Sequence, residues 1–525
     1  MKNRIQFLLI ILWIISGNSV FSQTISSDYI DSLVQKSMDM MPQAGVAVAV
    51  VLDGKIVHAK GYGTTSISTG ERIDENTLFA IASNSKSFTT ASLAMLVDEG
   101  KLNWTDKVVD HIPEFKMYDP YITANFNIED LLTHRSGLGL GAGDLMFFPD
   151  GSDFTIKDVL KSFQYQKPVS AFRTKYDYDN LLYIVAGEVV ARASGMSWTD
   201  FVENRIMKPI GMVRSAGVYQ NLQDKKNVAS PHSSLNGKLV ELEAYTKPDA
   251  TLGSAGGIYS SVNDLSKWLQ IHLNKGRYGE DLENQLFSEK NQSEMWRPHT
   301  QIRFNLQPDL PYRTHFSAYG LGWRISDQNG YIIIGHTGGL PGMLSRTVLI
   351  PELSAGIVVL TNADPGGYSY WTISSAIIDV LIGVEKKDWL TEMKQQIEMM
   401  ESRGDSVLTA VWDIVENSRF KKPNPKDYIG TYRDNWFGDV EIWLDDNNEL
   451  WFRSHRSPKL TGSMHYYRAN TFAIKWNYTD MPCDAFAMFS LDENGKAINI
   501  RMKAISPNTD FSFDFHDLDL RRIAE

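Results

Sequence analysis

The hydrophobic pattern of the chain begins with two apolar runs, Val46–Leu52 and Ile56–Ala59, on either side of Asp53-Gly54. Apolar runs that flank an Asp-Gly pair are typical of a β-hairpin, because these residues accept the positive φ angles of a tight turn. Strand patterns then disappear for more than 200 residues. They return in Tyr331–Ile334, Leu344–Ile350 and Ile357–Thr361.

Between these strands the apolar residues recur at helical spacing. The clearest case is Leu181–Ala193, where one face is apolar and Gly195 follows the last periodic residue. A chain that begins with a hairpin, inserts helices and ends with strands most simply builds one antiparallel sheet from both of its ends. We therefore predict an α+β fold with helices flanking the sheet, an all-helical second lobe, and a cleft between the two.

The hydrophobic pattern changes again near Lys421-Lys422-Pro423-Asn424-Pro425, where prolines break a charged helical stretch. After this break the chain consists of short alternating runs separated by turn residues, which indicates a small all-β barrel or sandwich. The predicted organisation is a hydrolase domain over 23–385, a helical segment and linker over 386–425, and a β-barrel over 426–525. The expected barrel strands are Val440–Leu444, Glu449–Arg453, Thr471–Trp476, Phe486–Leu491 and Ile498–Lys503.

Residues 1–22 have a different pattern: Lys2 and Arg4 precede an apolar run, and the small residue Ser22 stands before Gln23. This arrangement is typical of a secretory signal peptide, and we expect a secreted or periplasmic mature protein. The alternative is a retained membrane anchor, although the apolar run is short for a membrane span. With Cys483 as the single cysteine, internal disulfides and paired-cysteine metal sites are excluded.

Composition adds limits on partners. The chain has 43% hydrophobic and 22% charged residues, as expected for a globular protein. Its formal charge is −11, and removal of Lys2 and Arg4 with the leader makes it −11 − 2 = −13. Nucleic acid and anionic membranes are therefore unsuitable partners, and we expect a small-molecule or peptide substrate. We also expect no stable membrane span in the mature chain, while the sequence leaves the oligomeric state open.

The first candidate for chemistry is Ser83, which has Lys86 three positions later and an apolar helical pattern behind it. If a helix begins at Ser83, both side chains lie on one face, and a buried lysine of lowered pKa can take the serine proton. The same spacing recurs at Ser418 and Lys421, but there it is polar and stopped by Pro423. Only Ser83 is therefore predicted to be a nucleophile.

A second candidate group is Tyr178-Asp179-Asn180, which stands directly before the periodic helix at Leu181. A phenol beside a lysine can relay a proton to a leaving group, and a side-chain amide can hold the amide of a substrate. The chain contains another Tyr-x-Asn at Tyr219, which no periodic helix follows.

The third candidate group is Gly335-His336-Thr337-Gly338-Gly339, directly after the run Tyr331–Ile334. Glycines on an edge strand allow the backbone of a substrate to pair with it, and the N–H groups of Gly339 and Ser83 would form an oxyanion hole. His336 or Thr337 would hold a substrate carboxylate. Taken alone, a His-Thr-Gly is more often a turn.

Together, and in this order, the three groups resemble the serine β-lactamase and penicillin-binding protein superfamily, on its class C and DD-peptidase branch. The similarity extends from about Gly45 to Gly383, and the tail from about Tyr428 resembles a lipocalin-like domain. The further segments that carry the resemblance are Leu131-Leu132-Thr133-His134-Arg135-Ser136-Gly137-Leu138, Pro209-Ile210-Gly211-Met212, Ser254-Ala255-Gly256-Gly257-Ile258-Tyr259-Ser260-Ser261 and Tyr319-Gly320-Leu321-Gly322-Trp323.

The resemblance implies a role for each candidate. Ser83 would be the acylated nucleophile, Lys86 and Tyr178 the proton-transfer pair, and Asn180 a substrate contact. The segment His336-Thr337-Gly338 would take the place of the Lys-Thr-Gly strand motif. Histidine in place of lysine is only partly charged at neutral pH, which favours peptidase, amidase or esterase activity over β-lactamase activity.

The sequence therefore predicts a secreted serine hydrolase that acts through an acyl-serine on amide, peptide or ester bonds, as a DD-peptidase, a D-amino-acid peptidase or an esterase. The alternatives are a class C-like β-lactamase, and a penicillin-binding sensor or wall-binding protein with little turnover. An α/β-hydrolase and a zinc peptidase are disfavoured because Gly-x-Ser-x-Gly and His-Glu-x-x-His are absent. We expect neither a metal ion nor another cofactor. All candidate catalytic residues precede Pro425, so the tail is predicted to be dispensable for acylation, and the roles left open for it are to shape the cleft, to cover it or to mediate assembly.

Overall fold

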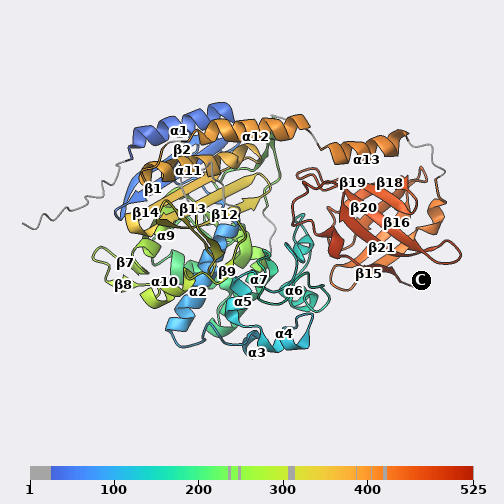
Figure 1. Cartoon of the computed structure of the whole chain (residues 1–525), viewed down its shortest axis with the longest axis horizontal. Helices are drawn as coiled ribbons and strands as arrows, with labels where there is room; N and C mark the ends of the chain where they lie inside the picture. The colour runs from blue at the N-terminus through green and yellow to red at the C-terminus, as the bar shows by residue number, and fades with distance from the viewer. Residues whose placement is uncertain are drawn as a thin grey trace, which may run out of the picture.

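The computed structural model describes residues 25–234, 238–245, 250–304, 314–385, 387–403, 405–417 and 422–523. The predicted leader, Ser418 and Lys421 lie outside these ranges. The described chain forms two bodies, a larger α/β part and a β-barrel beside it (Figure 1). Among the described helices, none has both the length and the apolar character required to cross a bilayer.

The α/β part is built on one antiparallel sheet with the strand order β2-β1-β14-β13-β12-β11-β10-β9. The predicted hairpin is present, and β1 also pairs with β14, where Val46 lies opposite Thr361. The two ends of this part of the chain therefore pair within one sheet, as the sequence predicts. The strands are β1 (Gly45–Leu52), β2 (Lys55–Gly63), β9 (Thr300–Gln301), β10 (Ser317–Tyr319), β11 (Arg324–Gln328), β12 (Tyr331–Leu340), β13 (Met343–Ile350) and β14 (Ala355–Thr361).

Helices cover both faces of this sheet. Successive residues of β1 alternate between two hydrophobic cores, because side chains of a strand point to opposite faces: Val46 and Val48 pack with α1 and α11, whereas Ala47 and Ala49 belong to the core on the side of α9. Figure 1 shows α1 and α11 above the sheet and α9 below it. The helices that contact the sheet are α1 (Ser27–Met40), α9 (Val262–Leu273) and α11 (Ser369–Leu381). Behind them, α12 (Trp389–Arg403) packs on α1 and α11, whereas α2 (Ser85–Asp98) and α10 (Glu289–Met295) pack on each other.

The predicted helical lobe lies between β2 and β9 in the chain and below the sheet in Figure 1. Its central helix, α7 (Leu181–Ser194), is apolar on nearly every side and ends at Gly195, whose φ of 75° suits glycine. The other helices of the lobe are α3 (Val108–His111), α4 (Pro120–Asn125), α5 (Ile128–Leu132), α6 (Ile156–Ser162) and α8 (Trp198–Phe201). Short strand pairs in this region are β3 (Phe79–Ala80) with β6 (Tyr259–Ser260), β4 (His232–Ser233) with β5 (Val240–Glu241), and β7 (Arg277–Tyr278) with β8 (Asn284–Gln285).

The C-terminal body is a closed barrel in which each strand pairs with its neighbour in the chain and the last strand pairs with the first. The barrel form, rather than a sandwich, is therefore confirmed. The sequence pattern missed β15, β18 and β22, in which polar residues interrupt the alternation. The strands are β15 (Gly430–Asp434), β16 (Gly438–Leu444), β17 (Leu450–Ser454), β18 (Thr461–Arg468), β19 (Thr471–Trp476), β20 (Ala485–Leu491), β21 (Ala497–Ala504) and β22 (Leu520–Arg522).

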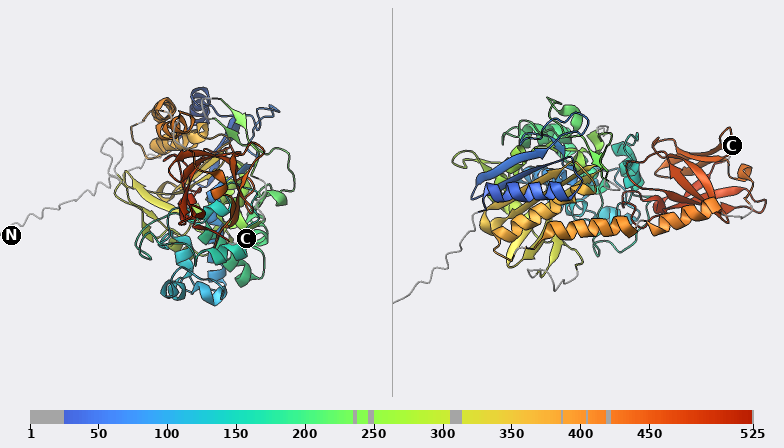
Figure 2. Two further views of the ribbon diagram at one scale, coloured as in Figure 1. Left: turned by 90° about the vertical axis from the view of Figure 1, so that its right-hand side faces the viewer. Right: turned by 90° about the horizontal axis from the view of Figure 1, so that it is seen from above.

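Two helices connect the bodies, and Figure 2 shows them nearly in line in the view from above. The first, α12, packs against α1 and α11 and so belongs to the α/β part. The second, α13 (Ser406–Asn417), packs on the barrel, where Val411 joins a small core and Trp412 Nε1 donates to Asp484 Oδ2 at 3.0 Å. The helical segment thus changes its packing partner between Arg403 and Ser406.

Candidate active site

Ser83 lies at the junction of the sheet and the helical lobe. It occupies a 3₁₀ turn, η1 (Ala82–Asn84), and α2 begins only at Ser85, so the helix starts two residues later than predicted. Ala82 has a φ of 48°, an uncommon conformation for a residue with a side chain, and it turns the chain sharply just before Ser83. Asn84 fixes the turn to β13 because its side chain donates to Ser345 Oγ at 2.8 Å and accepts from Thr347 Oγ1 at 2.7 Å.

Lys86 is fully buried and its ammonium group has three contacts within hydrogen-bonding distance. Nζ lies 3.0 Å from Ser83 Oγ, 2.7 Å from Asn180 Oδ1 and 2.8 Å from the carbonyl oxygen of Ala255. Burial lowers the pKa of Lys86 from 10.5 to about 7, although Asp144 and Asp179 act in the opposite direction.

These contacts suit a neutral amine as well as an ammonium ion. A neutral lysine has two N–H groups and one lone pair. Asn180 Oδ1 and the Ala255 carbonyl can only accept, so they take the two N–H groups, and the lone pair then faces the hydroxyl of Ser83. The geometry therefore places a base of nearly neutral pKa on the hydroxyl proton.

Asn180 is held from both sides of its amide. While Oδ1 faces Lys86, Nδ2 donates to Asp144 Oδ2 at 2.8 Å. Burial raises the pKa of Asp144 well above its usual value, and the contact with Asn180 offsets part of this effect. The sequence interpretation missed Asp144, because an aspartate in an irregular segment shows no periodic pattern that would place it beside Asn180.

Tyr178 lies beside Lys86, with its ring centre 4.8 Å from Nζ. Its hydroxyl is buried and has no hydrogen-bond partner of regular geometry among the described residues. Burial raises the pKa of Tyr178 well above 10, and contact with Ser83 offsets only part of this shift. Tyr178 is therefore a neutral phenol at physiological pH, which makes it a proton donor rather than a base. The ring of His134 packs behind it at 4.2 Å between centroids, and His134 Nδ1 accepts from the Asp179 N–H.

The glycine-rich segment is part of β12 and not a turn after a strand, because β12 continues to Leu340. Pairing with β11 ends at Gly335, opposite Arg324, so the strand from His336 to Leu340 has a free edge on that side. Gly338 contacts the nucleophile turn: a Cβ there would lie 2.1 Å from the Ile81 carbonyl oxygen and 3.0 Å from Ser83 N. Any side chain at this position would separate β12 from Ser83.

The structure corrects the electrostatic expectation for His336. Its Nε2 lies 2.8 Å from Tyr319 Oη, and its Nδ1 faces the carbonyl oxygen of Thr337, so both ring nitrogens have partners within the protein. Burial, followed by the nearby Arg324 and Lys86, lowers the pKa of His336 well below 6.5. His336 is thus neutral at physiological pH and is unsuited to hold a carboxylate through charge. Thr337 and Gly339 line the cleft as predicted.

The cation that does reach the cleft is Arg324, which the sequence interpretation missed. It is the first residue of β11 and pairs with Gly335 of β12, and its Nη2 donates to Tyr176 Oη at 3.1 Å. The signal in the sequence is weak: Arg324 follows the quoted segment Tyr319–Trp323 directly, but nothing in that pattern indicates that β11 begins at the cleft.

Ser83, Tyr178, Asn180, Arg324 and His336 line a cleft of about 350 Å³. Its wall is completed by the barrel, whose contribution the sequence did not specify: Met481, Asp510, Phe511 and Ser512. The Phe511 ring meets Tyr178 edge-on at 6.1 Å between centroids. The remaining lining residues, besides those already named, include Leu140, Phe148, Leu252, Gly256, Leu340, Pro341, Leu344, Asp364 and Tyr368.

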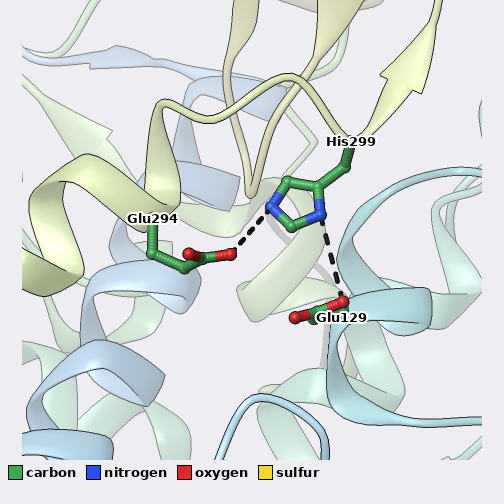
Figure 3. Close-up of side chains that lie close together, drawn as sticks. All are labelled: Glu129, Glu294 and His299. Atoms are coloured by element: carbon green, nitrogen blue, oxygen red, sulfur yellow. Dashed lines mark ion pairs between the residues drawn. The ribbon is translucent and has the colours of Figure 1, made fainter.

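A second polar group stands apart from this cleft. Glu129, Glu294 and His299 bring ligand-type atoms within 4.8 Å of one another, and Figure 3 shows His299 between the two carboxylates. None of the three lines the cleft of Ser83. The carboxylates already face arginines, since Arg297 Nη2 lies 2.7 Å from Glu294 and Arg135 Nη2 lies 3.6 Å from Glu129. The group therefore forms an ion-pair network.

An antiparallel sheet flanked by helices, a helical lobe, and a serine and lysine where they meet define the β-lactamase/transpeptidase-like class of fold. The chain belongs to the Beta-lactamase family, whose model matches residues 30–371. This is a family of serine hydrolases. A second model, described as a domain of unknown function (DUF3471), matches residues 422–522, which include the barrel.

Individual relatives agree with this assignment. The Unguisins hydrolase ungD of Aspergillus violaceofuscus is 25% identical over 439 residues, which are 78% of this chain and 76% of that protein. The octameric penicillin-binding protein homologue from Pyrococcus abyssi has 19% identity and a TM-score of 0.59, over 94% of this chain and 100% of the other. The penicillin binding protein from Bacillus halodurans has 22% identity and a TM-score of 0.54, over 66% and 99%. At these identities the two structures support the fold alone.

Proposed function

We propose that this protein is a secreted or periplasmic serine hydrolase that forms an acyl-enzyme on Ser83 and hydrolyses amide, peptide or ester bonds. The observation that carries the proposal is the position of the buried Lys86, whose Nζ lies 3.0 Å from Ser83 Oγ while its other contacts are hydrogen-bond acceptors. The predicted signal peptide, residues 1–22, supports secretion and lies outside the described residues.

In the acylation step, Lys86 takes the proton of Ser83 as Oγ attacks the carbonyl carbon of the substrate. The backbone N–H groups of Ser83 and Gly339 stabilise the oxyanion, and the close approach of Gly338 to Ser83 N supports this pairing. The bond to the leaving group then breaks. Tyr178 donates its proton to the leaving atom and regains one from Lys86, which becomes neutral again.

In the deacylation step, a water molecule attacks the ester formed with Ser83. Lys86 accepts the proton of this water, and the collapse of the second tetrahedral intermediate returns a proton to Ser83 Oγ. The free acid leaves, and the starting protonation states of Lys86 and Tyr178 are restored.

The test is covalent labelling of the purified full-length protein with a neutral fluorophosphonate, together with turnover of four substrate classes: D-amino-acid peptides, other short peptides and amides, small esters, and β-lactams. We expect one adduct by intact mass spectrometry, located on the peptide with Ser83, and no adduct and no turnover in Ser83→Ala. Labelling at Ser418, the other serine with a lysine three positions later, would contradict the proposal.

A penicillin-binding sensor with little turnover is the second candidate, and the similarity to penicillin-binding protein structures favours it for the fold alone. The likeness to a protein named as a hydrolase of unguisins favours turnover. A time course with a penicillin and with an ester separates the two. A sensor gives one equivalent of product and then stops, whereas a hydrolase continues with the ester.

A further inference from the structure

The barrel contributes a loop, residues 509–513, to the wall of the cleft. Asp514, at the end of this loop, is fully buried and accepts the backbone N–H groups of Gly143 and Leu145, both at 2.8 Å. Gly141 lies directly against Phe511, since a Cβ at position 141 would be 2.7 Å from the Phe511 carbonyl oxygen. These contacts hold the loop against the helical lobe, so that its residues have fixed neighbours in the cleft.

The loop brings a second carboxylate to the cleft. Asp510 lines the same cavity as Asp364, which follows the end of β14. Burial, followed by the charge of Asp510, raises the pKa of Asp364 to about 6. Within the described part of the chain, neither carboxylate pairs with a lysine, arginine or histidine, and the side chain of Asp510 accepts only the N–H of Ser512, at 2.9 Å. Two carboxylates that line one cavity without a paired cation leave negative charge uncompensated.

The two ends of the cleft therefore carry opposite charge. At one end, Arg324 lies opposite Gly335, just before the free edge of β12 begins. At the other end, Leu344 of β13 pairs with both Gly339 of β12 and Thr361 of β14. Asp364 follows Thr361 and so lies near the end of the free edge. The five steps from Gly335 to Leu340 span about 17 Å at 3.4 Å per step. A linear substrate that pairs with this edge extends between the arginine and the two aspartates.

The position of the proton donor indicates which half of the substrate lies at which end of the cleft. Tyr178 must reach the leaving atom. Its ring lies about equally far from those of His336 and Phe511, at 6.2 Å and 6.1 Å between centroids, but the groups that act most on its pKa include Arg324 and neither Asp364 nor Asp510. The leaving group thus points toward Arg324, and the acyl half points toward Leu340 and Asp364. The hydroxyl of Tyr178, buried and without a partner among the described residues, is aimed into this cavity and indicates that a ligand completes it.

We propose that Asp510 of the barrel loop, together with Asp364, binds an ammonium group in the acyl half of the substrate. The protein would then prefer amides, peptides or esters whose acyl half carries a free amine. This inference rests on the proposed hydrolysis through Ser83 and adds the chemical class of the acyl group. The cleft volume of about 350 Å³ and its apolar walls, such as Leu140 and Phe148, suit a small acyl group around that amine.

The test compares three anilides on the full-length protein, each as D and L forms: an alanine anilide with a free α-amine, its N-acetyl form without a cation, and an Nα-acetyl-lysine anilide with a side-chain amine. We expect the wild type to favour one of the two amine-bearing substrates over N-acetyl-alanine at least tenfold in kcat/KM. The preferred member identifies the source of the ammonium group. Equal kcat/KM values for all three would overturn the inference.

Asp510→Asn should remove most of this preference, lowering kcat/KM for the amine-bearing substrate about tenfold and leaving the acetylated alanine within twofold. Asparagine keeps the Oδ1 acceptor for the Ser512 N–H, so the turn is preserved. Glu493→Gln, at an exposed barrel turn, is the matched control and should change neither value. A parallel loss for both substrates in Asp510→Asn would show a structural role only and overturn the inference.

Two further measurements keep the result interpretable. Asp510→Lys should reverse the preference toward an N-succinyl-alanine anilide, which carries a carboxylate in its acyl half, and no reversal would count against the inference. The rate of Ser83 labelling by the neutral fluorophosphonate should be unchanged in all these variants. If the wild type is not labelled at all, the proposed hydrolysis fails, whereas normal labelling without any amine preference overturns only the present inference.

Discussion

The cleft has two walls of different construction. The α/β part supplies a floor in which Lys86 is fully buried and Asn180 is hydrogen-bonded on both sides of its amide. The barrel supplies a wall that rests on Asp514 and presents Phe511, which is 38% exposed, and the unpaired charge of Asp510. A buried floor whose lysine and amide are held by hydrogen bonds tolerates little change in geometry, whereas a partly exposed wall tolerates changes in its side chains.

This difference separates rate from selectivity. The floor contains every group that moves a proton in the proposed reaction, so its variants should affect all substrates alike. No group of the wall moves a proton in the proposed reaction, and variants of the wall should affect substrates according to their acyl half. A floor variant that affected substrates according to their acyl half, or a wall variant that affected all substrates alike, would contradict this division.

The largest effect is expected for Lys86→Met, which keeps a long side chain but removes the base. Acylation should fall about 10³- to 10⁴-fold, by a similar factor for amide, ester and fluorophosphonate. Steady-state kinetics and labelling rates measure this effect. Lys55→Met, on the exposed β-hairpin, serves as control and should match the wild type. A loss confined to amine-bearing substrates would contradict the division.

A smaller loss is expected for Tyr178→Phe. Because burial holds the pKa of Tyr178 well above 10, its contribution is proton donation to the leaving atom. An anilide or peptide should lose about 10²-fold in kcat/KM, whereas a p-nitrophenyl ester, whose leaving group needs no proton, should lose less than tenfold. Tyr219→Phe removes the hydroxyl of the other Tyr-x-Asn and should have no effect. Equal losses for both leaving groups would show that Tyr178 does not act as this donor.

The pH dependence of the floor follows from Lys86. Its pKa is lowered to about 7, and only the neutral amine takes the proton of Ser83, so activity is present above pH 7 and is lost as pH falls. For a neutral ester, kcat/KM should decrease about tenfold between pH 8 and pH 6. An ester with a carboxylate should show the same limb, because burial lowers the pKa of His336 well below 6.5. An additional limb for the carboxylate ester alone would restore the original expectation that His336 binds it when protonated.

The smallest effect on the floor is expected from Asp514→Ala, which frees two buried N–H groups. Loss of their acceptor should destabilise the protein by about 1–3 kcal/mol, measured by thermal or urea unfolding. The preference for an amine-bearing acyl group should fall a few-fold, while the rate of fluorophosphonate labelling stays within twofold. Asp492→Ala, at an exposed barrel turn, should leave the amine preference intact. A large loss of labelling would show that the loop also positions the floor.

The fold was predictable where apolar residues alternate along a strand, or recur at helical spacing, without interruption. The hairpin around Asp53-Gly54 and the helix before Gly195 were both predictable, because their patterns are local. The strand β18 was not, since its outward residues and its bulge between Tyr466 and Arg468 disturb the alternation. The apolar run Tyr331–Ile334 gave only the first part of β12, although the resemblance placed His336 on a strand, because glycines weaken a strand pattern even where a neighbouring strand pairs with them.

The candidate site was likewise predictable only in part. Ser83, Lys86, Tyr178 and Asn180 were identified from spacing, and the structure brings all four together. Their roles in catalysis stay predictions. Asp510 could not be identified, because its place in the cleft depends on how two domains dock. The neutral state of His336 likewise depends on burial by residues far away in the chain, which no spacing rule describes.

The connection through α12 and α13 has a consequence for how strongly the barrel must bind. Because both bodies belong to one chain, docking of residues 509–513 is intramolecular, and a tether of this kind gives an effective concentration on the order of millimolar. A contact with an intrinsic dissociation constant of about 10 µM would then be closed about 99% of the time. If the chain were cut between α12 and α13, the same contact would be mostly open at nanomolar concentrations of the two pieces. The tether therefore allows a weakly complementary loop to act as a lasting wall of the cleft.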